Sequence, residues 1–234
     1  MIDFHSHVLP GIDDGSRDTD MSLAMLRMEQ EQNVQAVVAT PHFYAEQDSV
    51  KSFLKRRSHS MERLMRAAAY EGLALMPIHS GAEVAYFRHI GEAAMIPQLC
   101  IQDSRVLLLE LPFCQWESFV YEDIAELLRK QELTVVLAHV ERYYRFQKDK
   151  VIWNAVMELP VYCQMNAGPF LDWRERKRSL DILKTQRCVL LGSDAHNLNS
   201  RKPNLREACS EIAKRAGEEY LEATEKLGSK LLGT

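Results

Sequence analysis

The chain has 234 residues, of which 46% are hydrophobic, and it carries a formal net charge of −4. This length is sufficient for one large hydrophobic core, and the mildly acidic balance argues against a nucleic-acid or polyanion binder. No apolar run approaches the length of a membrane span, and no basic and apolar leader precedes the first expected strand. The five cysteines show no paired spacing, which favours free thiols in a reducing compartment. Because the sequence has no linker-like segment, we expect one domain over residues 1–234, located in the cytoplasm.

The first segment, residues 1–16, begins with a short apolar strand that runs directly into His5 and His7. Alternate residues of an extended chain point to the same side, so both imidazoles can reach one point. Two imidazoles with a nearby carboxylate form half of a site for zinc, manganese or iron. A His-x-His pair is weak evidence when it stands alone, because two solvated histidines at a strand end give the same pattern.

Strands and helices alternate along the rest of the chain. A helix face that packs on the core is indicated by apolar residues at Met21, Ala24, Met25 and Met28. Apolar runs predict six further strands, over residues 34–40, 73–78, 106–112, 133–138, 161–165 and 188–191. The remaining helical patterns cover residues 49–71, 120–128, 150–158 and 173–185, and continue from residue 203 onward. Seven βα units predict an α/β fold in which a parallel sheet closes into a TIM-like barrel or near-barrel.

Polar side chains cluster where the expected strands end, which in such barrels is the face that carries the active site. Nine side chains are candidate metal ligands, and seven of them directly follow one of five strands. Glu110 stands out because burying a carboxylate in an apolar strand without a partner is costly. Three other histidines, His59, His79 and His89, have no partner at suitable spacing and are left out. The candidate ligands are His5, His7, Asp14, His42, Glu83, Glu110, His139, Asp194 and His196.

This set has nine donors and no cysteine. A catalytic metal takes three or four protein ligands, so nine donors suit two or three ions, with Glu83 as a bridge. Imidazole and carboxylate together suit manganese, iron or zinc better than copper or calcium, with magnesium as a further alternative. Such a centre lowers the pKa of a bound water to about 7, and the resulting hydroxide can attack a phosphate ester. Arg142 and Arg201 follow two of the ligand histidines and are expected to bind the phosphate, the alternative being surface arginines on loops.

The motifs resemble the polymerase-and-histidinol-phosphatase (PHP) superfamily. Within it they are most similar to the bacterial manganese-dependent protein tyrosine phosphatases of capsule and exopolysaccharide clusters, over residues 1 to about 201. The resemblance rests on the segments HSHVLPGIDDGS, ATPH, GAEV, LLLELPF, AHVERY, QMNAG and GSDAHN.

The resemblance implies the distorted barrel of the PHP fold with a trinuclear centre, for which manganese is the expected metal. It also implies that Arg142 binds phosphate together with a second arginine in the last loop, where we prefer Arg201 to Arg206. The three implied ligand sets are His5, His7, Glu83 and Asp194 for one metal, Glu83, Glu110 and His139 for the second, and Asp14, His42 and His196 for the third.

The activity implied by the resemblance is hydrolysis of phosphotyrosine, with an autophosphorylated tyrosine kinase that regulates polysaccharide synthesis as substrate. The first alternative is a small-molecule phosphomonoesterase such as histidinol phosphatase, but that branch tends to carry histidine where this chain has Asp14 and Glu110. The second alternative is a non-catalytic phosphotyrosine-binding module, which would not need an open multinuclear site.

Two further sequence features bear on the mechanism. The spacing Cys209-x5-Arg215 is that of a cysteine-dependent phosphatase loop, but the segment lacks glycine and has a helical apolar pattern, so we expect a structural role. Four aromatic residues lie just beyond ligand-bearing strand ends and could either wall a pocket for a phenyl ring or pack the loops. These residues are Phe43, Tyr44, Phe113 and Trp116.

Overall fold

Parallel strands in two sheets form the centre of the computed structural model, which describes residues 1–102, 104–185 and 189–233. The three-stranded sheet has the order β1 (Ile2–Ser6), β2 (Ala36–Ala39) and β4 (Ile78–Ser80). The six-stranded sheet has the order β3 (His42–Phe43), β5 (Glu83–Ala85), β6 (Val106–Glu110), β7 (Thr134–Leu137), β8 (Tyr162–Asn166) and β9 (Val189–Gly192).

The two sheets are parts of one barrel, because two strand paths are each interrupted once. β2 and β3 are separated by Thr40 and Pro41, and β4 and β5 by Gly81 and Ala82. The ends of the barrel meet where β1 lies beside β9: the backbone N–H of Asp194 donates to the carbonyl of His5 at 2.8 Å. The structure therefore confirms the predicted α/β barrel, with 3-10 turns instead of an α-helix between β5 and β6.

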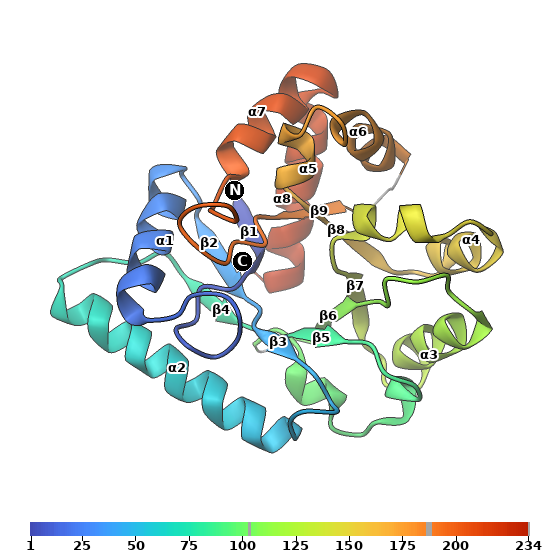
Figure 1. Cartoon of the computed structure of the whole chain (residues 1–234), viewed down its shortest axis with the longest axis horizontal. Helices are drawn as coiled ribbons and strands as arrows, with labels where there is room; N and C mark the ends of the chain where they lie inside the picture. Colours follow the sequence, from blue (N-terminus) through green and yellow to red (C-terminus); the bar gives the residue numbers. More distant parts are fainter. Residues whose placement is uncertain (103, 186–188, 234) are drawn as a thin grey trace.

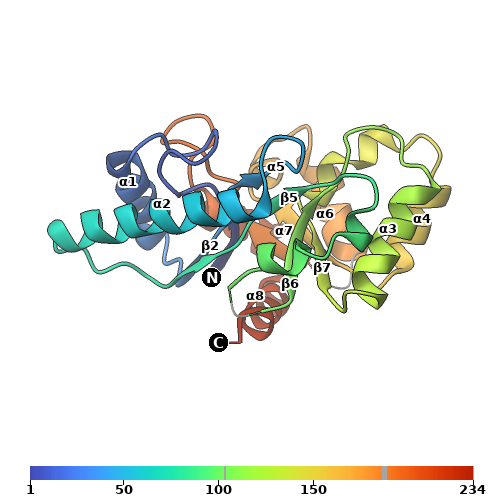
Figure 2. The ribbon, with the colours of Figure 1, turned by 90° about the horizontal axis from the view of Figure 1, so that it is seen from below.

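Helices surround the strands (Figure 1). Leu227, Leu231 and Leu232 of the last helix pack on the apolar side chains inside the barrel, and Figure 2 shows this helix across the end opposite the loops that follow the strands. None of the described helices is long and apolar enough to span a bilayer. The helices are α1 (Thr19–Glu31), α2 (Val50–Tyr70), α3 (Ser118–Arg129), α4 (Val151–Glu158), α5 (Gly168–Leu171), α6 (Arg176–Thr185), α7 (Leu205–Arg215) and α8 (Glu218–Leu232), with 3-10 turns at Ile90–Glu92, Ile96–Leu99, Val140–Arg142 and Tyr144–Phe146.

Strand β6 shows how the sequence pattern positions a polar side chain. Val106 and Leu108 pack inside the barrel, whereas Leu107 and Leu109 pack against the helices outside it. Because side chains alternate between the two faces of a strand, Glu110 is directed toward the interior at the end where the strand stops. An acidic residue in this apolar strand thus reaches the mouth of the barrel.

Two predicted starts differ from the structure by several residues, and a third lies outside the described residues. The strand expected over residues 73–78 begins only at Ile78, because Pro77 has no N–H to donate to a ladder. The helix expected from residue 173 begins at Arg176, after the short helix α5. The strand expected from residue 188 is described only from Val189, since Cys188 lies outside the described residues.

Candidate metal centre

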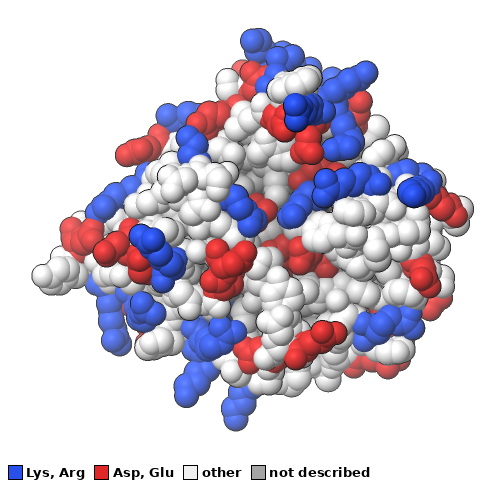
Figure 3. Space-filling model, viewed as in Figure 1, with Lys and Arg blue, Asp and Glu red and all other residues white. Residues whose placement is uncertain are grey.

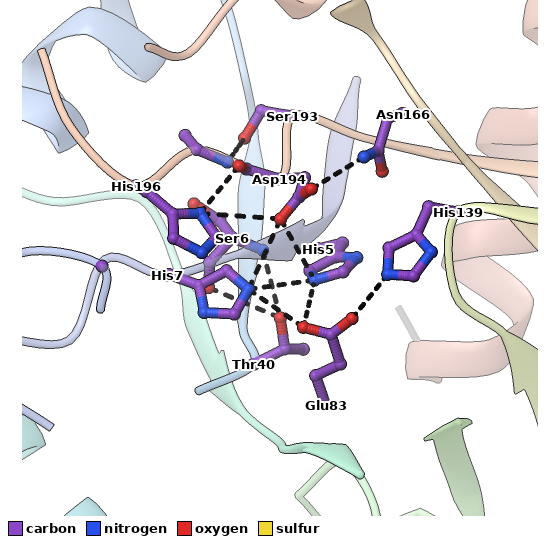
Figure 4. Close-up of polar contacts among 12 residues, drawn as sticks. His5, Ser6, His7, Thr40, Glu83, His139, Asn166, Ser193, Asp194 and His196 are labelled. Carbon is purple, nitrogen blue, oxygen red and sulfur yellow. Dashed lines mark hydrogen bonds and ion pairs between the residues drawn. The ribbon is translucent and has the colours of Figure 1, made fainter. Parts of the chain in front are cut away.

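All nine candidate ligands lie at one end of the barrel, in or just after the ends of the strands or in the loop after β1. Figure 4 labels His5, His7, Glu83, His139, Asp194 and His196 among them. Metal-ligating atoms within 4.8 Å of one another form three overlapping groups. The groups are His7, Asp14, His42 and His196; His5, His7 and Glu83; and His42, Glu83 and Glu110.

The group of His5, His7 and Glu83, together with Asp194, has the dimensions of a coordination shell. Nε2 of His5 and Nε2 of His7 are 3.1 Å apart, and Oε2 of Glu83 lies 3.1 and 3.2 Å from them. Oδ1 of Asp194 lies 3.6 and 3.5 Å from the same two nitrogens. Bonds of about 2.1 Å to one ion place neighbouring ligand atoms roughly 3.0–3.4 Å apart. The four side chains therefore fit a shared cation.

Glu83 also connects this shell to the remaining candidate ligands. Its Oε1 lies 2.8 Å from Nε2 of His139, which is also 3.4 Å from Oε1 of Glu110. On the opposite side, Nε2 of His42 and Nε2 of His196 each lie 3.5 Å from Oδ1 of Asp14. The distances from the two oxygens of Glu83 to the imidazoles on either side are those expected when one carboxylate bridges neighbouring ions.

Several of these buried atoms have no hydrogen-bond partner. They are Oε2 of Glu83, Nδ1 of His42 and Nε2 of His196. Leaving a buried polar group unpaired costs about 1–3 kcal/mol, and more for a charged group. Bound cations would remove this cost, so the residues present fit a metal centre.

The pKa values of the candidate histidines also show which positions favour a positive charge. Burial lowers the pKa of His7, but the hydrogen bond to Asp13 and the adjacent carboxylate of Glu83 outweigh it and raise that pKa to about 10. Burial likewise opposes protonation of His139, yet its carboxylate partners raise its pKa to about 9. Burial and the charge of His7 lower the pKa of His196 to about 4. Near neutral pH, His7 and His139 thus hold protons with which metal ions would compete, whereas His196 is free of a proton.

A second layer of polar residues orients the ligands, and the sequence analysis did not identify it. Oδ2 of Asp13 accepts hydrogen bonds from Nδ1 of His7 at 2.7 Å and from the backbone N–H of His42 at 2.9 Å. Because Nδ1 of His7 donates to Asp13, its Nε2 keeps the lone pair that a metal needs. Asp13 precedes Asp14, and the sequence alone does not tell a ligand from its neighbour.

Gln164 and Asn166 of β8 link three ligands in one chain of hydrogen bonds. Oε1 of Gln164 accepts from Nδ1 of His5 at 3.0 Å and from the backbone N–H of His139 at 2.7 Å. The amide of Gln164 donates to Asn166 at 2.9 Å, and Asn166 donates to Oδ2 of Asp194 at 2.8 Å. Two polar residues at alternate positions of an apolar strand were the signal that could have revealed them.

Backbone conformation is unusual at two of the ligands. His139 has φ 32° and Asp194 has φ 52°, a left-handed region that non-glycine residues seldom occupy. Such conformations cost on the order of 1–3 kcal/mol and persist where the surrounding structure enforces them. Here they turn the chain at the ends of β7 and β9.

Both expected arginines reach the centre. Nη2 of Arg201 donates to Oδ1 of Asp194 at 2.8 Å, and Nη1 of Arg142 lies 3.8 Å from Oδ2 of the same carboxylate. Their side chains are 41% and 40% exposed, so both guanidinium groups remain accessible from solvent. Arg206, the alternative considered, instead bonds to the backbone carbonyls of Glu31 and Gln32 at the end of α1.

The four aromatic residues divide into two pairs. Tyr44 and Phe113 are both 37% exposed, and their rings stack on His42 and His139 at 5.3 and 5.7 Å between centroids. The other two residues follow the packing alternative, because both are buried in the core, although Phe43 also lines a hollow beside Asp14 and His42. Trp116 stacks on Trp153, and Phe43 packs edge-on against Phe53.

Cys209 has no features of a nucleophile. It lies in the middle of α7, and burial raises the pKa of its thiol to about 11. The guanidinium of Arg215 is paired with Glu211 on the same helix at 2.7 Å. The geometry agrees with the predicted structural role.

Comparison with known proteins adds a family and a fold. The family model for "Capsular polysaccharide synthesis, CpsB/CapC" matches residues 1–227. Tyrosine-protein phosphatase CpsB of Streptococcus pneumoniae is 27% identical over 232 residues, covering 93% of this chain and 91% of CpsB. Tyrosine-protein phosphatase YwqE of Bacillus subtilis (strain 168) is 25% identical over 225 residues, covering 94% and 86%.

Solved structures give the same relationship. A chain from the crystal structures of YwqE from Bacillus subtilis and CpsB from Streptococcus pneumoniae, described as unique metal-dependent tyrosine phosphatases, superposes with a TM-score of 0.86. That match has 22% identity and covers 100% of this chain and 95% of the other. Amidohydrolase 2 from Bifidobacterium longum subsp. infantis gives a TM-score of 0.53 at 16% identity, covering 99% and 98%. The first match shows that the fold is shared over the whole chain.

Proposed function

Because the chain belongs to the CpsB/CapC family of capsular polysaccharide synthesis, we propose that it is a metal-dependent protein tyrosine phosphatase. Its relatives CpsB and YwqE carry the name tyrosine-protein phosphatase. The observation that carries the proposal is the position of Glu83, whose two oxygens face separate groups of imidazoles beside two accessible arginines. A carboxylate bridge with adjacent phosphate-binding groups suits phosphate ester hydrolysis.

The proposed ligands form three sets, two of which share Glu83. Bound ions would lower the pKa of a coordinated water and neutralise charge on the leaving oxygen. We propose manganese because the donors are imidazoles and carboxylates without a thiolate, a mixture that also admits iron, zinc or magnesium. The sets are His5, His7, Glu83 and Asp194; Glu83, Glu110 and His139; and Asp14, His42 and His196.

The phosphoryl group is proposed to bind between Arg142 and Arg201. Both guanidinium groups approach Asp194 from the solvent side, so phosphoryl oxygens entering there would meet two planar donors. Phe113 lies 4.8 Å from the guanidinium carbon of Arg142 and, like Tyr44, presents a partly exposed ring beside the centre. These rings are proposed to contact the phenyl ring of the leaving tyrosine.

The proposed physiological substrate is an autophosphorylated bacterial tyrosine kinase that controls capsule or exopolysaccharide synthesis. Support comes from the capsular description of the family and the phosphatase names of the relatives. We place the reaction in the cytoplasm, where a reducing environment would keep cysteines such as Cys100 and Cys209 free.

The proposal is tested by hydrolysis of a phosphotyrosine peptide with chelator-treated protein, before and after adding manganese. We expect activity only with manganese, and at least a hundredfold loss in His196→Ala at equal protein concentration. Histidinol phosphate is assayed in parallel, and faster turnover of that compound would favour a small-molecule phosphatase. Tight peptide binding without turnover in the metal-loaded protein would favour a binding module.

A further inference from the structure

A cavity of about 360 Å³ opens beside the metal centre and is lined by four arginines. Arg142 and Arg201 lie at its inner end, next to Asp194, and are accounted for by the proposed phosphoryl site. Arg145 and Arg178 also line it but touch none of the candidate metal ligands. Their presence needs a separate explanation, because the chain as a whole has a net charge of −4.

Neither of these two arginines is fully paired within the protein. Within residues 1–102, 104–185 and 189–233, Arg145 makes no ion pair, and its guanidinium carbon lies 4.8 Å from the centre of the Phe146 ring. Arg178 reaches one oxygen of Glu175 at 3.5 Å, while its buried Nε has no hydrogen-bond partner. The cavity thus holds cationic donors whose bonding capacity is unused.

Carboxylates in the cavity do not cancel this charge. Asp194 pairs with Arg201 and Arg142 at the inner end and does not reach Arg145 or Arg178. The carboxyl group of Glu141 is buried, with one oxygen accepting from the backbone N–H of Asn166 at 3.4 Å. Glu175 is the remaining carboxylate beside Arg145 and Arg178, and it lies 3.5 Å from Arg178. An anion entering the cavity would therefore meet a net positive field.

The other side of the metal centre has the opposite character. A hollow of about 550 Å³ is lined there by three aspartates, Asp13, Asp14 and Asp48. Its one arginine, Arg56, is already bonded to Asp48 at 2.6 Å and to the backbone carbonyl of Ile12 at 3.0 Å. Figure 3 shows acidic side chains at the floor of a central hollow on this face, with basic side chains along its upper edge.

We propose that Arg145 and Arg178 form a second anion-binding subsite for the peptide that carries the phosphotyrosine. The subsite takes a side-chain carboxylate or a second phosphate a few residues from the reacting tyrosine. The enzyme therefore prefers acidic or multiply phosphorylated tyrosine segments over neutral ones. This inference rests on the proposed function, since it adds specificity to the same reaction.

The test compares kcat/KM for three phosphotyrosine peptides of equal length: one with glutamates on both sides, one with a second phosphotyrosine, and one with alanines. We expect the two anionic peptides to exceed the alanine peptide in the unmodified enzyme. In Arg145→Gln/Arg178→Gln this ratio should fall about fivefold at low salt, as expected for two partly exposed charge pairs, and the ratio should shrink as salt increases.

Arg66→Gln is the matched control, because Arg66 is an exposed arginine on α2 that pairs with Glu62 and lies outside the cavity. Arg66→Gln should leave the ratio of kcat/KM between the anionic peptides and the alanine peptide unchanged. Equal kcat/KM for all three peptides, or an equal loss in the control, would overturn the subsite. A gain for the doubly phosphorylated peptide alone would support the subsite and identify phosphate as the anion.

Hydrolysis of p-nitrophenyl phosphate, which has no flanking residues, reports the metal centre separately. A wild-type protein inactive on every substrate would refute the proposed function instead.

Discussion

Replacing Asp13 by asparagine should weaken metal binding although Asp13 is not a proposed ligand. Oδ2 of Asp13 accepts from His7 and His42, and Oδ1 accepts from the backbone N–H of Gly15 at 3.0 Å. An asparagine has one oxygen, so in either orientation its NH2 group faces a donor. Loss of a partner that orients a ligand typically costs 10–100-fold in metal affinity, or about 1.4–2.7 kcal/mol. We expect the upper part of this range.

The assay is the apparent Kd for manganese, measured by competition with a chromophoric chelator at constant pH. Asp48→Asn is the matched control, since it removes a carboxylate from the same hollow but one that pairs with Arg56 and touches no proposed ligand. Unchanged manganese affinity in Asp13→Asn, or an equal loss in Asp48→Asn, would refute the assigned orienting role.

Three further substitutions test other parts of the account. Gln164→Leu leaves the backbone N–H of His139 without its partner, so the free energy of unfolding in urea should fall by about 1–3 kcal/mol and activity should fall with it. Phe113→Ala should raise KM for a phosphotyrosine peptide several-fold with kcat retained, because a partly exposed ring beside the centre is lost. Burial and the charge of Asp3 raise the pKa of Glu29 well above its usual value, so the folded chain keeps a proton that the unfolded chain releases above about pH 4.5. This contribution makes stability fall as pH rises past that value, and Glu29→Gln should therefore gain stability relative to the unmodified chain between pH 5 and pH 8.

Each of these expectations has a result that would contradict it. Gln164→Leu with unaltered stability would show that its buried amide is dispensable. A similar KM for Phe113→Ala and for Tyr70→Ala, which removes an exposed ring from α2, would remove Phe113 from the substrate site. A stability difference between Glu29→Gln and the unmodified chain that stays constant with pH, or one that Glu31→Gln reproduces, would show that Glu29 titrates normally.

The position of the candidate ligands could be predicted because topology decides it. Parallel strands in a barrel end on the same face, so a residue such as Glu110 or His139 needed only to follow its strand to join the site. The fold class followed from the same alternation of strands and helices. Neither inference required knowledge of side-chain contacts.

Side-chain orientation beyond the strand ends could not be predicted in the same way. Phe113 and Trp116 lie three residues apart, yet one is partly exposed beside His139 and the other is buried against Trp153. Contacts with a helix distant in the sequence determine which ring is buried, and the local sequence pattern does not predict these contacts. The break between β2 and β3 is similar, because Pro41 ends one ladder while the chain resumes pairing at His42 in the other sheet.

The claim that these side chains form a metal centre is tested most directly by anomalous diffraction from crystals grown with manganese. The account predicts manganese peaks at up to three positions, each within bonding distance of one proposed set and with Glu83 between two of them. Full phosphotyrosine phosphatase activity in a protein with no metal at these side chains would contradict it.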